Sequence, residues 1–144
     1  MSFLKTCTKV SHCDTVPAKV IVNVSSLAAI QAFPSWGVYC SGKGIAFHNT
    51  ANDLLPAARD MLHKVLAEEE AKSNVRVLNY APGPLDTEMQ RITRETCSDE
   101  TLRATFAKMY EEGKLVSPDD SAQKLLLLLD EDNYTQGQHI DYFD

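Results

Sequence analysis

The chain alternates short β-branched apolar runs with longer helical patterns, and this alternation is the feature that most constrains its fold. The runs are KVIVNV at residues 19–24, VRVLNY at 75–80 and the weaker HIDYF at 139–143. Runs this short and apolar are typical of strands that are covered on both faces of a sheet. The long segments between them leave room for the crossovers that parallel strands require. The sequence therefore predicts an α/β fold with three parallel strands and flanking helices.

Three longer segments carry helical patterns. Residues 57–71 repeat apolar side chains at helical spacing, and these are Ala58, Met61, Leu62, Val65 and Leu66. Residues 98–112 open with a serine and two acids and stop at a glycine, as helices commonly do. Ser117 and Pro118 open the third helix, because serine caps a helix and proline suits its first position. We expect the five leucines of this helix, residues 125–129, to lie in the core.

Length and charge narrow the class of protein. A chain of 144 residues has the length of one domain. Its formal net charge of −6 argues against a nucleic-acid partner, which needs a basic surface. No stretch is apolar enough to cross a membrane and residues 1–18 lack the apolar core of a signal peptide, so we expect a cytoplasmic protein. The cysteines and histidines show no metal-ligand spacing, and we expect no metal site.

The segment GVYCSGKG, residues 37–44, has two interpretations. Gly37, Gly42 and Lys43 have the spacing of a phosphate-binding loop. Such a loop directly follows a strand and needs a hydroxyl side chain after its lysine. No strand is predicted immediately before this segment, and the residue after Lys43 is Gly44. The sequence therefore does not favour a nucleotide triphosphatase.

In the second interpretation, Tyr39 and Lys43 form a proton-transfer pair. Residues four apart are neighbours on a helix, and a nearby ammonium lowers the pKa of a phenol from about 10 towards neutrality. Ser26 ends the first predicted strand, where open α/β sheets bind their ligands, so its hydroxyl could hold a substrate carbonyl. We expect Ser25 to stabilise the strand end instead. The three side chains Ser26, Tyr39 and Lys43 suit the reduction of a carbonyl group.

Three elements together resemble the active-site pattern of the short-chain dehydrogenase/reductase family. They are a strand that ends in Ser-Ser, a Tyr-x-x-x-Lys thirteen positions after Ser26, and a Pro-Gly turn followed by Thr87. The resemblance runs from about residue 20 to the last residue. It implies the C-terminal portion of a doubly wound, Rossmann-like parallel sheet and a single partial domain at residues 1–144.

Within the family, the segments VNVSSLAAIQAF, GVYCSGK and NVRVLNYAPGPLDTEMQ closely resemble those of cytosolic, homodimeric reductases that use NADPH to reduce side-chain ketones of pterins. The catalytic residues that this resemblance implies are Ser26, Tyr39 and Lys43. The implied cofactor-binding residues are Lys43, Leu85, Asp86, Thr87, Glu88, Met89 and Gln90. The implied substrate-binding residues are Ser26, Leu27, Tyr39, Gly83 and Asp141. A carboxylate such as Asp141 can accept two parallel N–H bonds from the guanidine-like edge of a pterin.

The chain departs from the family pattern in two places. The Gly-rich turn that binds the pyrophosphate of NADPH has no counterpart, because no glycine precedes Gly37. Residues 44–56 are an insert, and a helix continued through them would arrive roughly 220° out of phase. We therefore expect the helix to break after Lys43 and to restart near residue 52 or 53.

Two hypotheses of different classes remain open at the level of the sequence. The chain is part of an NADPH-dependent reductase, or it is a non-catalytic fragment that keeps the serine, tyrosine and lysine but cannot bind NADPH. The missing Gly-rich turn favours the second for this polypeptide alone.

Overall fold

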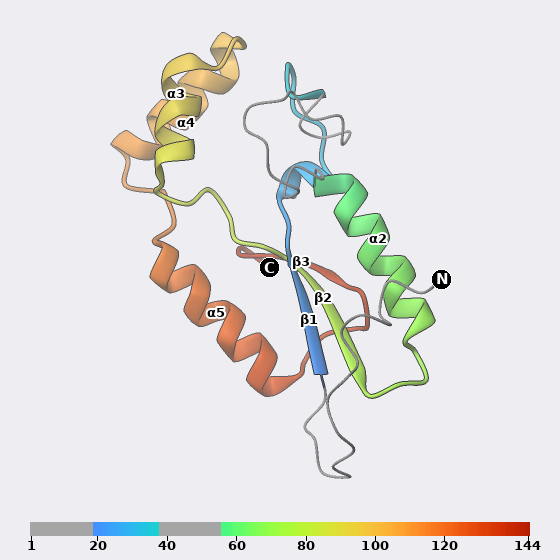
Figure 1. Ribbon diagram of the computed structural model, residues 1–144. Helices are drawn as coiled ribbons and strands as arrows, with labels where there is room; N and C mark the ends of the chain where they lie inside the picture. Colours follow the sequence, from blue (N-terminus) through green and yellow to red (C-terminus); the bar gives the residue numbers. More distant parts are fainter. Residues whose placement is uncertain (1–18, 38–55) are drawn as a thin grey trace.

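The computed structural model describes residues 19–37 and 56–144. The strands are β1 (Lys19–Val24), β2 (Val75–Ala81) and β3 (His139–Asp141). The helices are the short 3-10 helix η2 (Leu27–Ala29) and the α-helices α2 (Pro56–Glu69), α3 (Glu88–Thr96), α4 (Glu100–Glu111) and α5 (Pro118–Glu131). Figure 1 shows the sheet at the centre, with α2 on one side, α5 on the other, and α3 beside α4 beyond the ends of the strands.

The described sheet is parallel throughout, in the order β1-β2-β3. In register, Lys19 lies opposite Val75, and Ala81 lies opposite Asp141. Parallel strands end at the same side of a sheet, here called the carboxyl edge. The α/β prediction with three parallel strands and flanking helices is confirmed.

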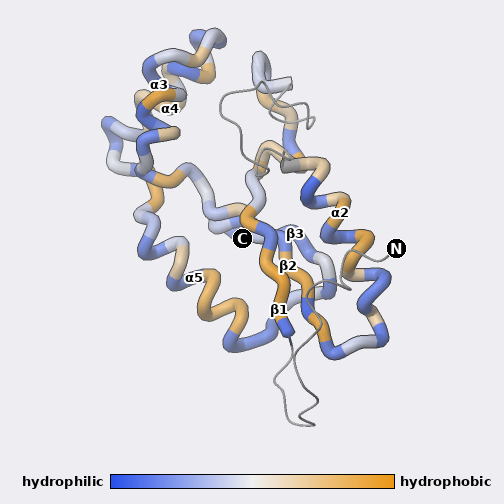
Figure 2. The backbone as a smooth tube through the Cα atoms, in the orientation of Figure 1, coloured by the Kyte–Doolittle hydropathy of each residue, from blue (hydrophilic) through white to orange (hydrophobic). Residues whose placement is uncertain are grey.

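The apolar core lies between the sheet and α5. Its buried residues are Leu78, Tyr80, Tyr134 and Ile140, and Val22, Leu125, Leu128 and Leu129 pack against them. The hydroxyl of Tyr80 donates to the carbonyl of Ser121 at 2.9 Å, so the buried phenol is satisfied at the start of α5. Figure 2 shows apolar residues on the strands and on the part of α5 beside them.

The expectation that residues 125–129 all lie in the core is wrong. Leu126 and Leu127 are 64% and 60% exposed. Five consecutive residues cover more than one full helical turn, so they cannot all face one sheet.

The expectation that the first strand is covered on both faces is also wrong within the described residues. Val20 and Val24 are 41% and 54% exposed. The reason is that β1 is the edge strand of the described sheet, whereas the core with α5 centres on β2 and β3.

The apolar stripe of α2 faces outward rather than onto the sheet. Met61, Leu62 and Val65 are about half exposed or more, whereas Asp60 and Ala67 are buried. The helix begins at Pro56, which suits a first helical position. The predicted break after Lys43 and restart near residue 52 or 53 lie outside the described residues.

No helix within the described ranges is long and apolar enough to cross a membrane.

Candidate active site

The carboxyl edge brings together candidate residues from all three strands. Ser26 follows β1, Gly83 follows β2 and Asp141 ends β3. The register places Val24 beside Tyr80, and Ala81 beside Asp141, so the three strand ends are neighbours in space. Ligands of open α/β sheets bind at this edge.

Ser26 is the N-cap of η2 and has extended backbone angles. Its side-chain oxygen accepts a hydrogen bond from the backbone N–H of Ala28 at 3.2 Å. A hydroxyl that accepts one bond still has its own proton to donate. Among the described residues nothing takes that proton, so Ser26 can donate to a carbonyl oxygen. Leu27, the next candidate residue, is 37% exposed beside it.

Gly83 forms the turn that leaves β2, with a positive φ of 78°. A Cβ atom added here would lie 3.2 Å from the Cβ of Tyr142 and 3.2 Å from a methyl of Val116. Glycine is therefore needed both for the backbone angle and for the close approach of the C-terminal tail. Helix α5 also fixes this turn, because the hydroxyl of Ser121 donates to the carbonyl of Pro82 at 3.0 Å.

Asp141 is buried at the end of β3, with 8% of its surface exposed. Its Oδ1 accepts the backbone N–H of Phe143 at 3.1 Å, and its own N–H donates to Asp144 at 2.8 Å. Lys124 holds the same tail by donating to the carbonyl of Tyr142 at 2.7 Å. Oδ2 of Asp141 has no hydrogen-bond partner in the described part of the chain, so it remains open to a ligand.

The candidate cofactor segment, residues 85–90, leads from the turn into α3. Leu85 forms a parallel bridge with Val116, and Asp86 donates its N–H to the carbonyl of Val116 at 3.0 Å. Thr87 caps α3 without a side-chain hydrogen bond, so its hydroxyl is uncommitted among the described residues.

The last three residues of this segment lie in the first turn of α3. Met89 is 69% exposed, and Glu88 pairs with Arg91 at 2.6 Å. Gln90 is buried and donates to the carbonyl of Phe106 at 3.4 Å, which ties α3 to α4. Gln90 is thus committed to helix packing, and the exposed members of the segment are better placed to touch a ligand.

Tyr39 and Lys43 lie outside the described residues, and so does the separation between Ser26 and Tyr39. The described segment that leads towards them is anchored by aromatic packing. Trp36 stacks on Phe106 of α4 with ring centroids 5.6 Å apart, and Phe33 lies 5.7 Å from Trp36.

The sequence patterns do not predict a buried polar cluster beneath the end of β1, here called the Asp60 cluster. Asn23 donates to Oδ1 of Asp60 at 3.1 Å and to Asn79 at 2.8 Å. The hydroxyl of Ser25 donates to Oδ1 of Asp60, and Nδ1 of His139 lies 2.5 Å from Oδ2. Asparagines at the same position of two apolar runs, Asn23 and Asn79, were the available signal, since they are cross-strand partners.

Hydrogen bonding decides the charge state at the centre of this cluster. Burial by itself raises the pKa of Asp60, but the hydrogen bonds from His139 and Ser25 outweigh it, so the pKa lies below its ordinary value. Asp60 is therefore an ionised carboxylate at neutral pH.

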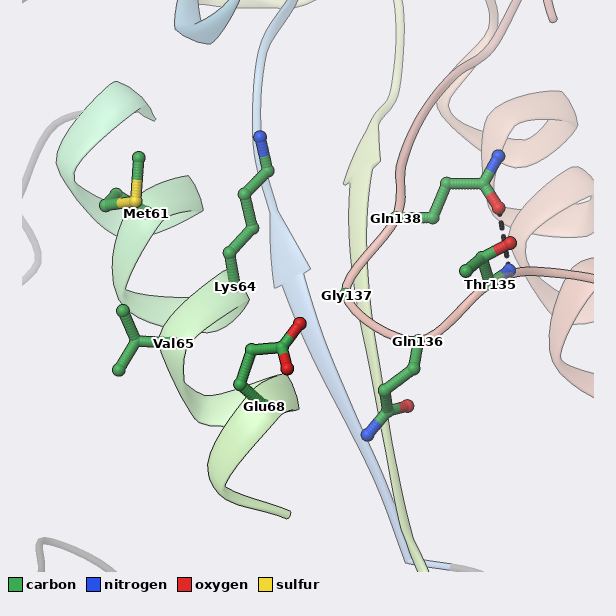
Figure 3. A pocket seen from close by; sticks show the side chains of 8 residues that line it. All are labelled: Met61, Lys64, Val65, Glu68, Thr135, Gln136, Gly137 and Gln138. Atoms are coloured by element: carbon green, nitrogen blue, oxygen red, sulfur yellow. Dashed lines mark hydrogen bonds between the residues drawn. The ribbon is translucent and has the colours of Figure 1, made fainter. Parts of the chain in front are cut away.

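A hollow between α2 and the loop before β3 lies apart from the candidate site. Met61, Lys64, Val65 and Glu68 line it from the helix, and residues 135–138 line it from the loop (Figure 3). It opens beside the amino end of β3, opposite the carboxyl edge.

In the described part of the chain, no group of three or more histidine, cysteine or acidic side chains could hold a metal ion.

Comparison with known families identifies the class of protein. The sequence profile of the short chain dehydrogenase family matches residues 2–98, which is more than half of the chain. The chain therefore belongs to the short chain dehydrogenase family, a family of oxidoreductases.

Its similar relatives include sepiapterin reductases. The chain is 50% identical to that of Rattus norvegicus over 127 residues and 52% identical to that of Xenopus tropicalis over 126 residues. It is 33% identical over 125 residues to a Bacillus cereus benzil reductase ((S)-benzoin forming). These matches cover 88%, 88% and 85% of this chain but 43%, 42% and 45% of the relatives. The chain thus spans less than half the length of the curated relatives that it matches.

Two solved structures share the fold. The KRED1-Pglu enzyme has a TM-score of 0.65 at 23% identity, covering 84% of this chain and 46% of that one. The Pseudomonas aeruginosa RhlG/NADP active-site complex has a TM-score of 0.53 at 21% identity, covering 85% and 44%. These similarities show the Rossmann-like fold alone.

Proposed function

We propose that this chain carries the catalytic part of an NADPH-dependent reductase of pterin side-chain ketones, a step of tetrahydrobiopterin biosynthesis. The observation that carries the proposal is the 50% to 52% identity to sepiapterin reductases over 88% of the chain. The common carboxyl edge of Ser26, Gly83 and Asp141 supports it. The net charge of −6 supports a small-molecule substrate rather than nucleic acid, and a cytoplasmic location is part of the proposal.

In this proposal, each catalytic side chain has one task. The hydroxyl of Ser26 donates to the substrate carbonyl, which suits its free proton and its single accepted bond from Ala28. Tyr39 donates the proton that the reduced oxygen needs. Lys43 lowers the pKa of Tyr39 so that proton transfer is feasible near neutral pH.

NADPH supplies the hydride when it is bound. The residues of this chain fit its nicotinamide end: Lys43 for the ribose, and residues 85–89 with the uncommitted hydroxyl of Thr87 and the exposed side chain of Met89. They do not fit its pyrophosphate, because the Gly-rich turn has no counterpart in the sequence.

The pterin would lie against Leu27 and Gly83, with Asp141 at its guanidine-like edge. Gly83 lets the tail that follows Asp141 pack closely against the turn, and Asp141 keeps one carboxylate oxygen free while the other holds Phe143. A carboxylate anchored in this way is preorganised for paired N–H donors.

We also propose that the complete enzyme is a homodimer. The exposed apolar stripe of α2, with Met61, Leu62 and Val65, supports an interface on that helix. Sedimentation of the complete enzyme as a monomer at micromolar concentration would contradict this assembly.

The second candidate function is that of a non-catalytic fragment. The observation that favours it is the absence of a Gly-rich turn, together with a described sheet that ends at the half-exposed β1. Under this alternative, the polypeptide keeps the catalytic side chains but does not bind NADPH.

A chimera tests the proposed function directly. The matching segment of the rat sepiapterin reductase is replaced by this chain, and NADPH-dependent reduction of sepiapterin is followed by absorbance. We expect activity, and Tyr39→Phe should lower kcat by about a hundredfold or more while leaving NADPH affinity nearly unchanged, since it removes only the proton donor. An inactive but folded chimera would contradict the proposed function, and equal loss of activity and affinity would reassign Tyr39 to binding.

A further inference from the structure

Asp60 joins all the strands of the described sheet to α2. Its three direct partners in the cluster are Asn23 of β1, Ser25 at the end of β1 and His139 of β3, and Asn23 links it to Asn79 of β2. The side chains of Asp60 and His139 are 4% and 7% exposed. A carboxylate buried this deeply is costly unless hydrogen bonds compensate for lost water. Here each of its oxygens has a donor or an imidazole nitrogen beside it.

Ser25 connects this cluster to the candidate active site. Its N–H donates to the carbonyl of Tyr80 at 2.7 Å, and its hydroxyl donates to Asp60. The backbone N–H and the side-chain hydroxyl of Ser25 are therefore both fixed by hydrogen bonds. Successive side chains of an extended backbone point to opposite faces, so fixing Ser25 towards α2 also fixes the direction of Ser26.

Ser26 depends on this anchor because the regular ladder ends before it. The strand β1 stops at Val24, and the next hydrogen bond that holds the chain is that of Ser25. Ser26 then accepts from Ala28 within η2, which is a short local contact. Among the described residues, the Asp60 cluster is thus the nearest rigid support of the Ser26 hydroxyl.

The geometry excludes a hydrolytic use of the same residues. A nucleophilic serine needs a histidine at its hydroxyl, with the acid behind the histidine. Here Asp60 lies between Ser25 and His139, and Ser25 is only 7% exposed. The cluster therefore holds other groups in place and does not react itself.

We propose that Asp60 is a positioning residue of the candidate active site, which acts through Ser25 to fix where Ser26 presents its hydroxyl to a carbonyl substrate. This inference rests on the proposed function for its chemistry but not for its geometry. Asp60 touches neither substrate nor cofactor in it.

The first test measures the geometry in the 144-residue chain itself. Amide hydrogen exchange is followed by NMR in Ser25→Ala, Asp60→Asn, the conservative Ser25→Thr and the control Asp130→Asn, which alters an exposed aspartate of α5. In the first two variants, we expect exchange at residue 25 and at Ala28 to accelerate at least about tenfold more than exchange at Leu78 in β2, which reports the loss of global stability. Ser25→Thr and Asp130→Asn should match the parent chain. Unchanged exchange, or equal acceleration at Leu78, would overturn the proposal.

The second test measures the consequence in the chimera. We expect Asp60→Asn and Ser25→Ala to lower kcat by about tenfold, with KM for NADPH within about twofold, because a displaced hydroxyl weakens catalysis without touching the cofactor. Ser25→Thr should restore most of kcat. A purely structural role would reduce the folded fraction, measured by circular dichroism, but would leave kcat per folded molecule unchanged, and that result would overturn the proposal. If the parent chimera is inactive, the proposed function fails while the exchange measurement still decides the role of Asp60.

Discussion

Gly83 is the residue at the carboxyl edge whose replacement has the clearest expected cost. Its φ of 78° is unfavourable for any residue with a side chain, and a Cβ would meet Tyr142 and Val116 at 3.2 Å. The left-handed backbone alone costs roughly 1–2 kcal/mol. We expect Gly83→Ala to lower the free energy of unfolding in urea by more than that, because the tail must also move.

Gly113 provides the matched control for this prediction. It also has a positive φ, of 63°, but a Cβ there would meet nothing within 4 Å. Gly113→Ala should therefore show the cost of the backbone angle alone. Equal losses in the two variants would mean that Tyr142 and Val116 give way freely, and Gly83 would then have no role in spacing the tail.

Asp60 should make the protein sensitive to acid. Its pKa in the folded state lies below the ordinary value of 3.8, because hydrogen bonds from His139 and Ser25 outweigh burial. An acid with a depressed pKa stabilises the fold above its unfolded pKa, and this stability is lost as the pH falls through the folded value. Between pH of about 5 and 3, the free energy of unfolding in urea should therefore fall more steeply in the parent chain than in Asp60→Asn.

Asp130→Asn is the control for this acid sensitivity as well. Asp130 is an exposed acid of α5, so its variant should follow the parent chain at every pH. The same steepness in Asp60→Asn and the parent would show that Asp60 is not ionised in the folded protein.

At this scale the sequence predicts single residues only where the signal is local. Two serines after an apolar run were enough to put Ser26 at the carboxyl edge, because the end of a strand is a local property. The Asp60 cluster joins residues 23, 25, 60, 79 and 139. No local sequence pattern predicts contacts between residues that lie so far apart in the chain. A buried aspartate within a helical pattern looks like any solvated helical acid.

At the scale of elements, strands were easier to predict than the faces of helices. The runs at 19–24 and 75–80 match β1 and β2 to within one residue, because β-branched residues between polar segments mark both ends. Ser117 caps α5 as predicted, accepting the N–H of Asp119 at 3.2 Å. Helix α3 was not predicted, since EMQRITRET carries few apolar residues and forms against α4. The outward stripe of α2 depends on what surrounds the helix, which its own periodicity does not contain.

The edge of β1 is the element most exposed to unwanted pairing. Lys19 and Ser25 direct their N–H groups to the β2 side, so the alternating residues Val20 and Val22 direct theirs to the other side, where no described residue pairs with them. Val24 does so too, although Arg59 donates to its carbonyl at 2.8 Å. An apolar strand with free backbone groups associates with other chains. We therefore expect the isolated chain to self-associate with rising concentration in sedimentation velocity.

A charge on this strand should suppress the association. Val20→Lys places an ammonium on the half-exposed edge, and lysine is a common natural protection of edge strands. Leu127→Lys is the matched control, because Leu127 is even more exposed but lies on α5. Loss of association in Leu127→Lys alone would move the interface to that helix, and a monodisperse parent chain would show that residues outside the described ranges cover the edge.

At the scale of the whole molecule, the decisive property is what this polypeptide can bind on its own. We expect no measurable affinity for NADPH. In the proposed function, residues 85–89 and Lys43 contact only the nicotinamide end, whereas the pyrophosphate and the 2′-phosphate normally rely on a Gly-rich turn, a helix N-terminus and basic side chains. The net charge of −6 adds a mild repulsion of a polyanion. Association also costs at least several kcal/mol before any contact stabilises the complex.

Titration of the purified chain with NADPH, followed by fluorescence and by calorimetry, measures this affinity. The chimera with the rat enzyme is the positive control, because the Gly-rich turn of the family pattern is expected in the part taken from that enzyme. The chimera should therefore saturate at micromolar NADPH, whereas the chain alone should show only the heat of dilution. The isolated chain should also show only the heat of dilution with a nicotinamide dinucleotide that lacks the 2′-phosphate, since both cofactors need the missing pyrophosphate contacts. Saturation of the isolated chain at micromolar NADPH would contradict the fragment hypothesis, and the polypeptide would then be an enzyme that builds its pyrophosphate site from residues other than a Gly-rich turn.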